Sequence, residues 1–322
     1  MSVLLGDTRA MSIFISIASY RDPELVRTIK SAIDNAAYPE ELYFSVVLQE
    51  FEKFEPDLSW VPRMSLLKMH PRDARGAGFA RAQAMKAFDS QDYYLQIDSH
   101  TMFEKHWDIK AIDQLKKAQD IAKNNKIILS YFPPPFYVEQ NKTISIVKNS
   151  KTQPPYPTKQ KPKLTKRNEW TAERIEFSDR KMSMPEQSTT VLAGFLFTIG
   201  SIVEEVPYDP EISFFGEELC FAVRAWTRGW DIYSPSVIIA YHFYTREGYS
   251  KIWKDRNIRK VSWKELEDIS KAKQKRILCG VEEGIFGVGS YRHLKAYEKM
   301  TGIDFKKMYN HSSDTIVFGQ RN

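Results

Sequence analysis

Largely apolar runs alternate with helix-like segments along the first 130 residues of this 322-residue chain. The runs have the composition of buried strands, and they cover residues 12–18, 42–48, 64–69, 93–97 and 127–131. The helix-like segments lie between them, at about residues 23–38, 76–88 and 107–121. Strands that alternate with helices build a mostly parallel sheet covered on both faces. The sequence therefore predicts an α/β fold.

Three neighbouring residues mark the start of the first helix. Asp22 can cap the helix, Pro23 suits its first position, and Glu24 is favourable near the positive end of the helix dipole. On this interpretation Tyr20-Arg21-Asp22 is only a strand-to-helix turn, unless its side chains also contact a ligand.

The alternation of strands and helices breaks at Pro133-Pro134-Pro135. From there to about residue 187 the sequence is polar, basic and proline-rich, which is typical of a lid, a binding loop or disorder. An apolar run at 188–199 and a helix from Phe215 to about Arg228 follow, then strands near 231–233 and 236–241. We expect one domain over residues 1–245, with a basic insertion at about 133–187. We expect residues 246–322 to form a basic, helical C-terminal extension that is a candidate acceptor-binding region.

The net charge of +6 is concentrated in two segments. Residues 141–181 hold 11 Lys and Arg against 4 Asp and Glu, and residues 246–277 hold 11 against 5. Basic segments favour polyanions such as nucleic acid, an anionic membrane surface or nucleotide phosphates. A solvated basic face is the simpler interpretation of the same charge.

The two cysteines, Cys220 and Cys279, lie in otherwise globular stretches and are predicted to be reduced thiols. The N-terminal residues lack the charged region and apolar run of a signal peptide, and no apolar stretch has the length of a membrane span. We therefore expect a cytoplasmic protein, in the host cytoplasm if it is viral, with no membrane span. The sequence leaves the oligomeric state open.

The triplet Asp98-Ser99-His100 directly follows the strand-like run at 93–97. In an extended chain residues i and i+2 point to the same side, so Asp98 and His100 can converge on one ion. Open α/β sheets bind ligands at the carboxyl ends of their strands. One carboxylate and one imidazole suit Mn²⁺ or Mg²⁺, with diphosphate oxygens and water as the remaining ligands. Taken alone, an Asp-x-His triplet is weak evidence for a metal site.

Several further motifs occur in a fixed order around this triplet. They are Ile17-Ala18-Ser19-Tyr20-Arg21-Asp22-Pro23, Arg75-Gly76-Ala77-Gly78-Phe79-Ala80-Arg81-Ala82, Trp107, Ala193-Gly194-Phe195-Leu196-Phe197, Tyr208-Asp209, Phe215-Gly216-Glu217-Glu218, Arg224-Ala225-Trp226 and Tyr241-His242. Over residues 12–130 and 188–245 the sequence resembles nucleotide-sugar glycosyltransferases of the GT-A fold, which is Rossmann-like. It is similar above all to the Skp1-type hydroxyproline N-acetylglucosaminyltransferases and, more distantly, to the polypeptide N-acetylgalactosaminyltransferases.

The resemblance implies a set of roles for individual residues. The metal ligands would be Asp98, His100 and His242, and the ion Mn²⁺ or Mg²⁺. Glu217 and Glu218 would bond sugar hydroxyls, one of them near the reacting centre. The UDP-sugar donor would contact Ser19, Tyr20, Arg21, Arg75, Arg81, Gln96, Ser99, Ala193 and Gly194; the two arginines of the second motif would meet the base or the diphosphate.

Each of these residues also has a plain structural interpretation. Arg81 could be a surface arginine of a helix, and Glu217 and Glu218 could be favourable only because they open a helix. Gly76 and Gly78 could be a loose helix start, since a lone Gly-x-Gly is weak evidence for phosphate binding. His242 could be a core histidine.

The resemblance implies transfer of a sugar, GlcNAc from UDP-GlcNAc, to an acceptor hydroxyl with retention of configuration. No carboxylate can be named as a nucleophile, so we favour attack from the side of the leaving group. The acceptor could be a protein hydroxyproline. A hydroxymethylated base of phage DNA would also suit the basic segments, whereas a cell-surface glycan fits less well. The competing classes are a non-enzymatic nucleic-acid-binding protein and a nucleotidyltransferase, which typically uses paired carboxylates.

Overall fold

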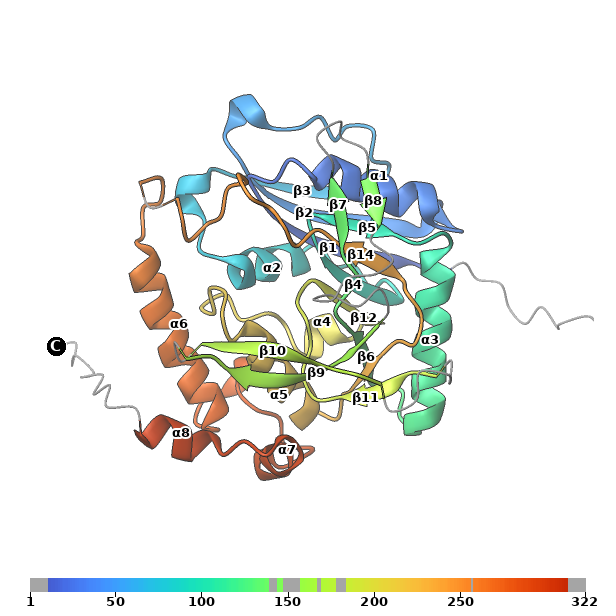
Figure 1. The fold of residues 1–322 in the computed structure, drawn as a ribbon. Helices are drawn as coiled ribbons and strands as arrows, with labels where there is room; N and C mark the ends of the chain where they lie inside the picture. Colours follow the sequence, from blue (N-terminus) through green and yellow to red (C-terminus); the bar gives the residue numbers. More distant parts are fainter. Residues whose placement is uncertain are drawn as a thin grey trace, which may run out of the picture.

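The computed structural model describes residues 11–138, 144–146, 157–166, 169–177, 184–255 and 257–311. Its centre is an eight-stranded sheet whose strands lie in the order β11-β13-β6-β12-β4-β1-β2-β3 (Figure 1). The strands are β1 (Ile13–Tyr20), β2 (Leu42–Gln49), β3 (Met64–Met69), β4 (Tyr93–Asp98), β6 (Ile127–Ser130), β11 (Glu186–Ser188), β12 (Phe195–Ile199) and β13 (Asp231–Ser234). Strands β1 to β4 are parallel where they pair, and so are β6 and β13. The predicted α/β class is confirmed.

Strand β12 runs antiparallel to both of its neighbours, β4 and β6. Its first residue, Phe195, therefore pairs with Ile97 near the last residue of β4. Residues that precede β12 are brought to the edge of the sheet where the parallel strands end. This reversal places Gly194, the residue before β12, next to Asp98.

Helices cover both faces of the sheet. Successive side chains of a strand point to opposite faces, so residues of one strand pack against helices on both sides. Ile13, Ile15 and Ile17 pack with α1 (Leu25–Asn35) and α3 (Trp107–Ala122). Phe14 packs on the opposite face with α2 (Ala77–Met85), α4 (Ile202–Glu205) and α5 (Glu217–Thr227). The first helix begins at Leu25, later than predicted; Asp22 still accepts the backbone N–H of Glu24 at 3.0 Å through Oδ1.

The predicted insertion at about 133–187 contains strands in the parts that the structure describes. Strand β7 (Phe136–Val138) pairs with β8 (Ile144–Ile146), and β9 (Lys159–Leu164) forms an antiparallel pair with β10 (Trp170–Ile175). These parts are therefore ordered strands rather than one long loop. The proline-rich stretch around Pro154 and Pro155 lies outside the described residues.

The C-terminal region is helical only from Trp263 onward, and not from about residue 246 as predicted. Residues 246–262 contain no described helix or strand. Helix α6 (Trp263–Leu278) begins where the Ser262 hydroxyl accepts the Glu265 N–H at 3.1 Å, and α7 (Leu294–Thr301) and α8 (Phe305–His311) follow. The division at residue 245 stays a prediction.

Helices α6, α7 and α8 share a hydrophobic core with α5. Tyr297 and Phe305 are fully buried in this core beside Leu219 and Val223 of α5. The C-terminal helices therefore support the helix that begins with the Glu217-Glu218 pair.

We expect Phe305→Ala to lower the free energy of unfolding of the whole protein by about 3–5 kcal/mol, because it leaves a cavity in this shared core. Met300→Ala is the control; Met300 is exposed on α7, and its loss should change stability by no more than about 0.5 kcal/mol. Urea unfolding followed by tryptophan fluorescence and by circular dichroism measures both. Separate unfolding of the C-terminal helices, with the sheet unaffected by Phe305→Ala, would contradict a shared core.

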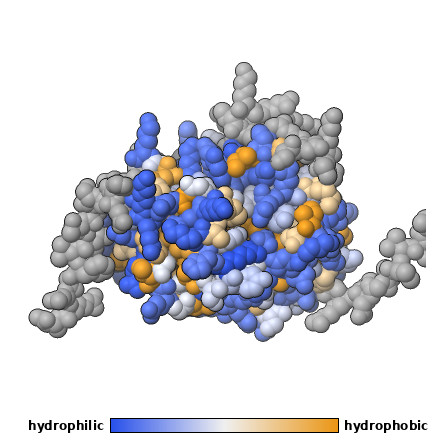
Figure 2. All heavy atoms as spheres, turned by 90° about the horizontal axis from the view of Figure 1, so that it is seen from below, coloured by the Kyte–Doolittle hydropathy of each residue, from blue (hydrophilic) through white to orange (hydrophobic). Residues whose placement is uncertain are grey.

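None of the helices in the described ranges combines the length and the apolar character needed to cross a bilayer. The face of the molecule in Figure 2 is mainly hydrophilic, with small hydrophobic areas scattered over it. Scattered apolar residues of this kind are normal on protein surfaces.

Candidate active site

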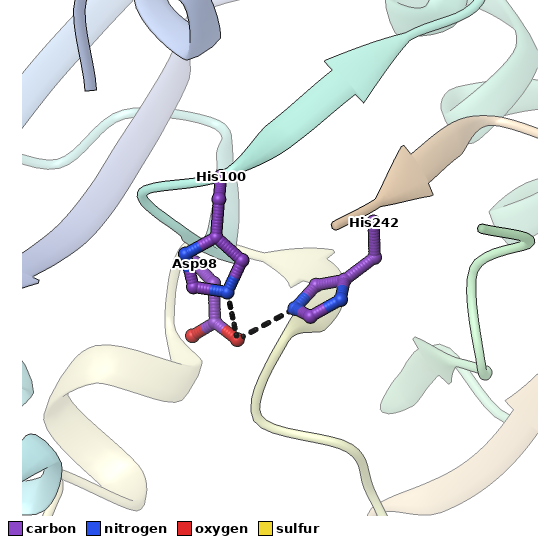
Figure 3. A group of neighbouring side chains, drawn as sticks. All are labelled: Asp98, His100 and His242. Atoms are coloured by element: carbon purple, nitrogen blue, oxygen red, sulfur yellow. Dashed lines mark hydrogen bonds and ion pairs between the residues drawn. The ribbon is translucent and has the colours of Figure 1, made fainter. Parts of the chain in front are cut away.

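Asp98, His100 and His242 converge at the edge of the sheet where β4 ends (Figure 3). Asp98 is the last residue of β4, and β5 (Thr101–Phe103) follows directly after His100. Strand β14 (Ala240–His242) pairs with β5 so that His242 lies opposite Thr101. Asp98 Oδ2 is 3.0 Å from His242 Nε2 and 3.7 Å from His100 Nε2. The short β5–β14 ladder thus brings together residues 144 positions apart.

Asp22 holds His100 in this arrangement. Its Oδ2 is 2.7 Å from His100 Nδ1, accepts the Ser99 hydroxyl at 2.9 Å and lies 3.2 Å from Arg246 Nη1. Burial alone would raise the pKa of Asp22, but the hydrogen bond and charge of His100, together with Arg246, hold it below its ordinary value. A carboxylate that accepts Nδ1–H leaves the lone pair on Nε2, which is the usual way in which proteins orient a metal-ligating histidine.

The ionised carboxylate of Asp98 and the neutral imidazole of His242 suit a divalent cation. Burial lowers the pKa of His242 to about 4, so its imidazole is neutral near neutral pH. Burial opposes ionisation of Asp98, yet the hydrogen bond from His242 and the charge of Arg81 keep its pKa well below the ordinary value. His100 Nε2 is buried without a hydrogen-bond partner. One carboxylate and two imidazoles, one of which has a buried ring nitrogen without a hydrogen-bond partner, fit a metal such as Mn²⁺.

Gly194 lies directly against this group. A Cβ atom at this position would come within 3.1 Å of Asp98 Oδ2 and 3.6 Å of His242 Nε2. The absence of a side chain therefore leaves the space beside two of the three candidate ligands open. That Ala193 and Gly194 let a ligand approach the backbone closely stays a prediction.

We expect Gly194→Ala to weaken Mn²⁺ binding roughly 10- to 100-fold, the range seen when residues around metal ligands are disturbed. The added methyl group is tight against Asp98 Oδ2, so the carboxylate must shift. Calorimetric titration of Mn²⁺ measures the affinity, and thermal unfolding checks that the protein is folded. Unchanged Mn²⁺ affinity in a folded variant would show that this space is not part of the site.

Arg81 connects Asp98, His100 and His242, which we call the metal group, to helix α5. It is buried, and its two terminal nitrogens contact Asp98 Oδ1 at 2.8 Å and Glu217 Oε1 at 2.6 Å. We expected Arg81 to meet the base or the diphosphate; instead, its guanidinium is paired with two protein carboxylates. Glu217 is buried, and burial raises the pKa of its carboxyl group in spite of Arg81.

Glu218 supports the backbone that precedes β12. Its Oε1 accepts the Ala193 N–H at 2.9 Å, and burial raises the pKa of its carboxyl group to about 7. Gly216, two residues earlier at the start of α5, adopts a φ of 84°, which is suited to glycine. Glu218 is thus tied to the Ala193-Gly194 segment.

Three other predicted donor contacts do not face the pocket. Ser19 is fully buried, because Ala18 and Tyr20 take the pocket side of β1. Gln96 is also fully buried; its amide donates to Ala193 O at 2.8 Å and so supports the backbone of the site. Arg75 is exposed, and its guanidinium lies 5.3 Å from the centre of the Phe79 ring.

The remaining predicted donor contacts directly follow strand ends or form them: Tyr20 is the last residue of β1, Arg21 follows it, and Ser99 follows β4. Tyr20 and Ser99 line the pocket, whereas Arg21 lines a neighbouring hollow. The Tyr20 hydroxyl and Arg21 Nη1 both contact Asp255 Oδ2, at 2.9 and 2.8 Å. Asp255 comes from the C-terminal region and was not among the predicted site residues.

Two pockets meet at the metal group and share Asp98, Gly194, Phe214, Glu217 and Glu218. The first, which we call the donor-side pocket because it holds several residues expected to contact the donor, is lined also by Ala18, Tyr20, Asp22, Gln49, Gly76, Ala77, Arg81, Ser99, His100, Ala193, Arg246, Ser250, Lys251, Ile252 and Trp253. The second, which we call the aromatic pocket, is lined also by Phe132, Pro133, Trp170, Thr171, Leu192, Phe215, Gly216, His242 and Tyr244. The candidate metal ligands thus face two differently built spaces.

The sequence model of the Glycosyltransferase (GlcNAc) family matches residues 12–65 and 61–307. The chain therefore belongs to this family, and the expected enzyme class, glycosyltransferase, is confirmed. No curated protein matches the sequence.

Two solved structures resemble the fold. GalNAc-T7, solved with UDP, GalNAc and Mn²⁺, is 15% identical with a TM-score of 0.58; the match covers 95% of this chain and 57% of that one. TarS residues 1–349 from S. aureus are 13% identical with a TM-score of 0.44, over 72% of this chain and 60% of that one. The chain thus spans little more than half of the GalNAc-T7 chain. The likeness to GalNAc-T7 confirms the GT-A fold.

Proposed function

We propose that the protein transfers GlcNAc from UDP-GlcNAc to an acceptor hydroxyl in a reaction that depends on a divalent cation, Mn²⁺ or Mg²⁺. The observation that carries the proposal is the convergence of Asp98, His100 and His242 at the carboxyl edge of the sheet, beside a pocket. The family description names GlcNAc, and the GalNAc-T7 structure was solved with UDP and Mn²⁺. Both support the choice of donor and ion.

The ion would supply neutralisation of the charge on the departing nucleoside diphosphate. The protein side chains hold its ligands: Asp22 orients His100, and Arg81 fixes Asp98. Gly194 leaves room for the sugar beside the metal group, and Glu218 fixes the backbone before it. Glu217 and Glu218 are the proposed contacts of sugar hydroxyls.

We propose retention of configuration, with the acceptor hydroxyl attacking from the face that the diphosphate leaves. Glu217 Oε1 is paired with Arg81 and Glu218 Oε1 accepts a backbone N–H, so each carboxylate has one oxygen engaged in holding the site. This favours positioning roles over a covalent role for both residues.

The aromatic pocket is the proposed acceptor site. None of the described residues that line it is Lys or Arg, whereas Phe132, Trp170, Phe215 and Tyr244 supply aromatic rings, two of which, Phe132 and Tyr244, also contact the Arg174 guanidinium. Such walls suit the flat, apolar face of a neutral ring. A hydroxyproline in a protein, the acceptor of the Skp1-type family, has such a ring, and we propose it as the acceptor.

The basic insertion gives less support to DNA as the acceptor. On β9, next to Trp170 of β10, Lys161 and Lys163 both pair with Glu173 at 3.2 and 2.8 Å. Their charge is in part balanced within the hairpin. A DNA acceptor predicts tight binding of duplex or single-stranded DNA that weakens steeply with salt, and a salt titration of DNA binding tests this second candidate.

A donor-hydrolysis screen tests the proposed function. The protein is incubated with UDP- and GDP-sugars, with Mn²⁺ or with a chelator, and the release of nucleoside diphosphate is measured. We expect release of UDP from UDP-GlcNAc above all other donors, and only with the metal. No release from any donor would contradict the proposal.

A further inference from the structure

Residues 246–255, which we call the strap, cross the donor-side pocket between β14 and α6. Five residues of the strap line this pocket: Arg246, Ser250, Lys251, Ile252 and Trp253. From its sequence this basic segment was expected to belong to a helical, acceptor-binding region. The structure instead brings it to the donor-side pocket, next to the metal group.

Both ends of the strap form hydrogen bonds with residues 20–22, where β1 ends and the turn before α1 begins. The contacts are Arg246 Nη1 with Asp22 Oδ2 at 3.2 Å, the Tyr249 hydroxyl with Glu24 Oε1 at 3.1 Å, and Asp255 Oδ2 with the Tyr20 hydroxyl at 2.9 Å and with Arg21 Nη1 at 2.8 Å. Between these ends the ring of Trp253 lies 4.8 Å from that of Phe214, centroid to centroid. Lys251 is therefore held at the pocket by contacts on either side of it in the chain.

The cations that line the donor-side pocket differ in how they are paired. Arg81 is paired with Asp98 and Glu217, and Arg246 with Asp22. Lys251 is half-buried, and no ion pair joins its ammonium group to any residue in the described part of the chain. A lysine placed in a pocket without a carboxylate partner is available to an anionic ligand.

From this we infer that Lys251 binds the diphosphate of the nucleotide donor, an assignment that rests on the proposed function. The lysine lines the same pocket as Asp98 and His100, so the diphosphate would meet the metal ion and the ammonium group in one space. The sequence suggested Arg75 and Arg81 for the diphosphate. Arg75 is exposed and does not line the pocket, and the Arg81 guanidinium is engaged with two carboxylates. The strap thus supplies the positive charge that the second sequence motif does not.

Lys251→Met tests the assignment, with Lys254→Met as the matched control. Lys254 lies three residues further along the strap, is exposed and does not line the pocket. Binding of UDP in the presence of Mn²⁺ is measured by calorimetry, and binding of uridine, which has no phosphate, by NMR titration. We expect Lys251→Met to weaken UDP binding roughly 10- to 100-fold, as for loss of a charge-assisted hydrogen bond. The affinity for uridine should be unchanged. Lys254→Met should bind both ligands with the affinity of the wild-type protein.

Lys251→Arg should restore most of the UDP affinity, because it returns the charge. Equal UDP affinity of the wild-type protein and Lys251→Met, or a parallel loss of uridine affinity, would overturn the assignment. A wild-type protein that binds no UDP with Mn²⁺ would contradict the proposed function itself, and the role of Lys251 with it. The two failures are therefore distinguishable.

Discussion

Replacement of Asp98 by asparagine should lower kcat/KM for the transfer by roughly 10³-fold, the upper range for loss of one preorganised group that stabilises charge. The amide keeps the size of the side chain but does not carry the negative charge that lies 3.0 Å from His242 Nε2. Binding of Mn²⁺ should fall together with activity. Calorimetric titration of Mn²⁺ and the rate of UDP release from UDP-GlcNAc measure the two effects.

The matched control is Asp113→Asn. Asp113 is exposed on α3 and pairs only with Lys117 one turn away at 2.7 Å, among the ion pairs of the described residues. Its replacement should leave activity and Mn²⁺ affinity unchanged. Because Asp98→Asn also removes one carboxylate partner of Arg81, thermal unfolding must show that the variant is folded. A folded Asp98→Asn protein with full metal-dependent turnover would contradict the assignment of the metal group.

Replacement of Asp22 by asparagine should weaken Mn²⁺ binding roughly 10- to 100-fold, although Asp22 is not a candidate ligand. Asp22 Oδ1 accepts the Glu24 N–H, and Oδ2 accepts from His100 and Ser99. In asparagine one of these two positions becomes an amide nitrogen, which cannot accept. Either the turn before α1 or the orientation of His100 is then lost. Calorimetric titration of Mn²⁺ measures the change in affinity.

Asp57→Asn is the control for loss of a turn carboxylate away from the site. Asp57 Oδ1 accepts the backbone N–H of Ser59, two residues on, in the same local pattern, but Asp57 is exposed and lies outside both pockets. Its replacement should leave Mn²⁺ affinity unchanged. Equal Mn²⁺ affinity in the wild-type protein and Asp22→Asn would show that Asp22 serves only the turn.

The fold could be predicted because the period of the apolar residues is a local signal. Each strand from β1 to β4 and β6 overlaps a predicted apolar run, and α1, α2 and α3 lie between them as expected. The direction of β12 could not be predicted in this way. Pairing of Phe195 with Ile97 depends on long-range contacts that leave no periodic trace in the sequence.

The candidate metal group was predicted as a set, but the partners of its members were not. Asp22 looked like a helix cap, and its contact with His100, 78 residues away, is decided by the fold. The direction of the Arg81 guanidinium likewise depends on Glu217. A signal for Ser19 was present: on β1, Ala18 and Tyr20 share one face, so alternation alone would have placed Ser19 on the other.

The prediction that the strap is helical was wrong, because its composition resembles that of a basic helix. Its path is instead set by Arg246, Tyr249 and Asp255, each of which contacts the turn that follows β1. The two residues of each contact are more than 200 positions apart in the sequence. Only the folded chain shows that they meet.

We propose that Asp98, His100 and His242 together hold the divalent cation that binds the donor diphosphate. Crystals grown with MnCl₂ and UDP test it most directly, through the anomalous scattering of manganese. We expect one strong anomalous peak between these three side chains, in contact with the UDP diphosphate. Manganese bound elsewhere, or UDP bound in the donor-side pocket with no metal at this group, would contradict the account.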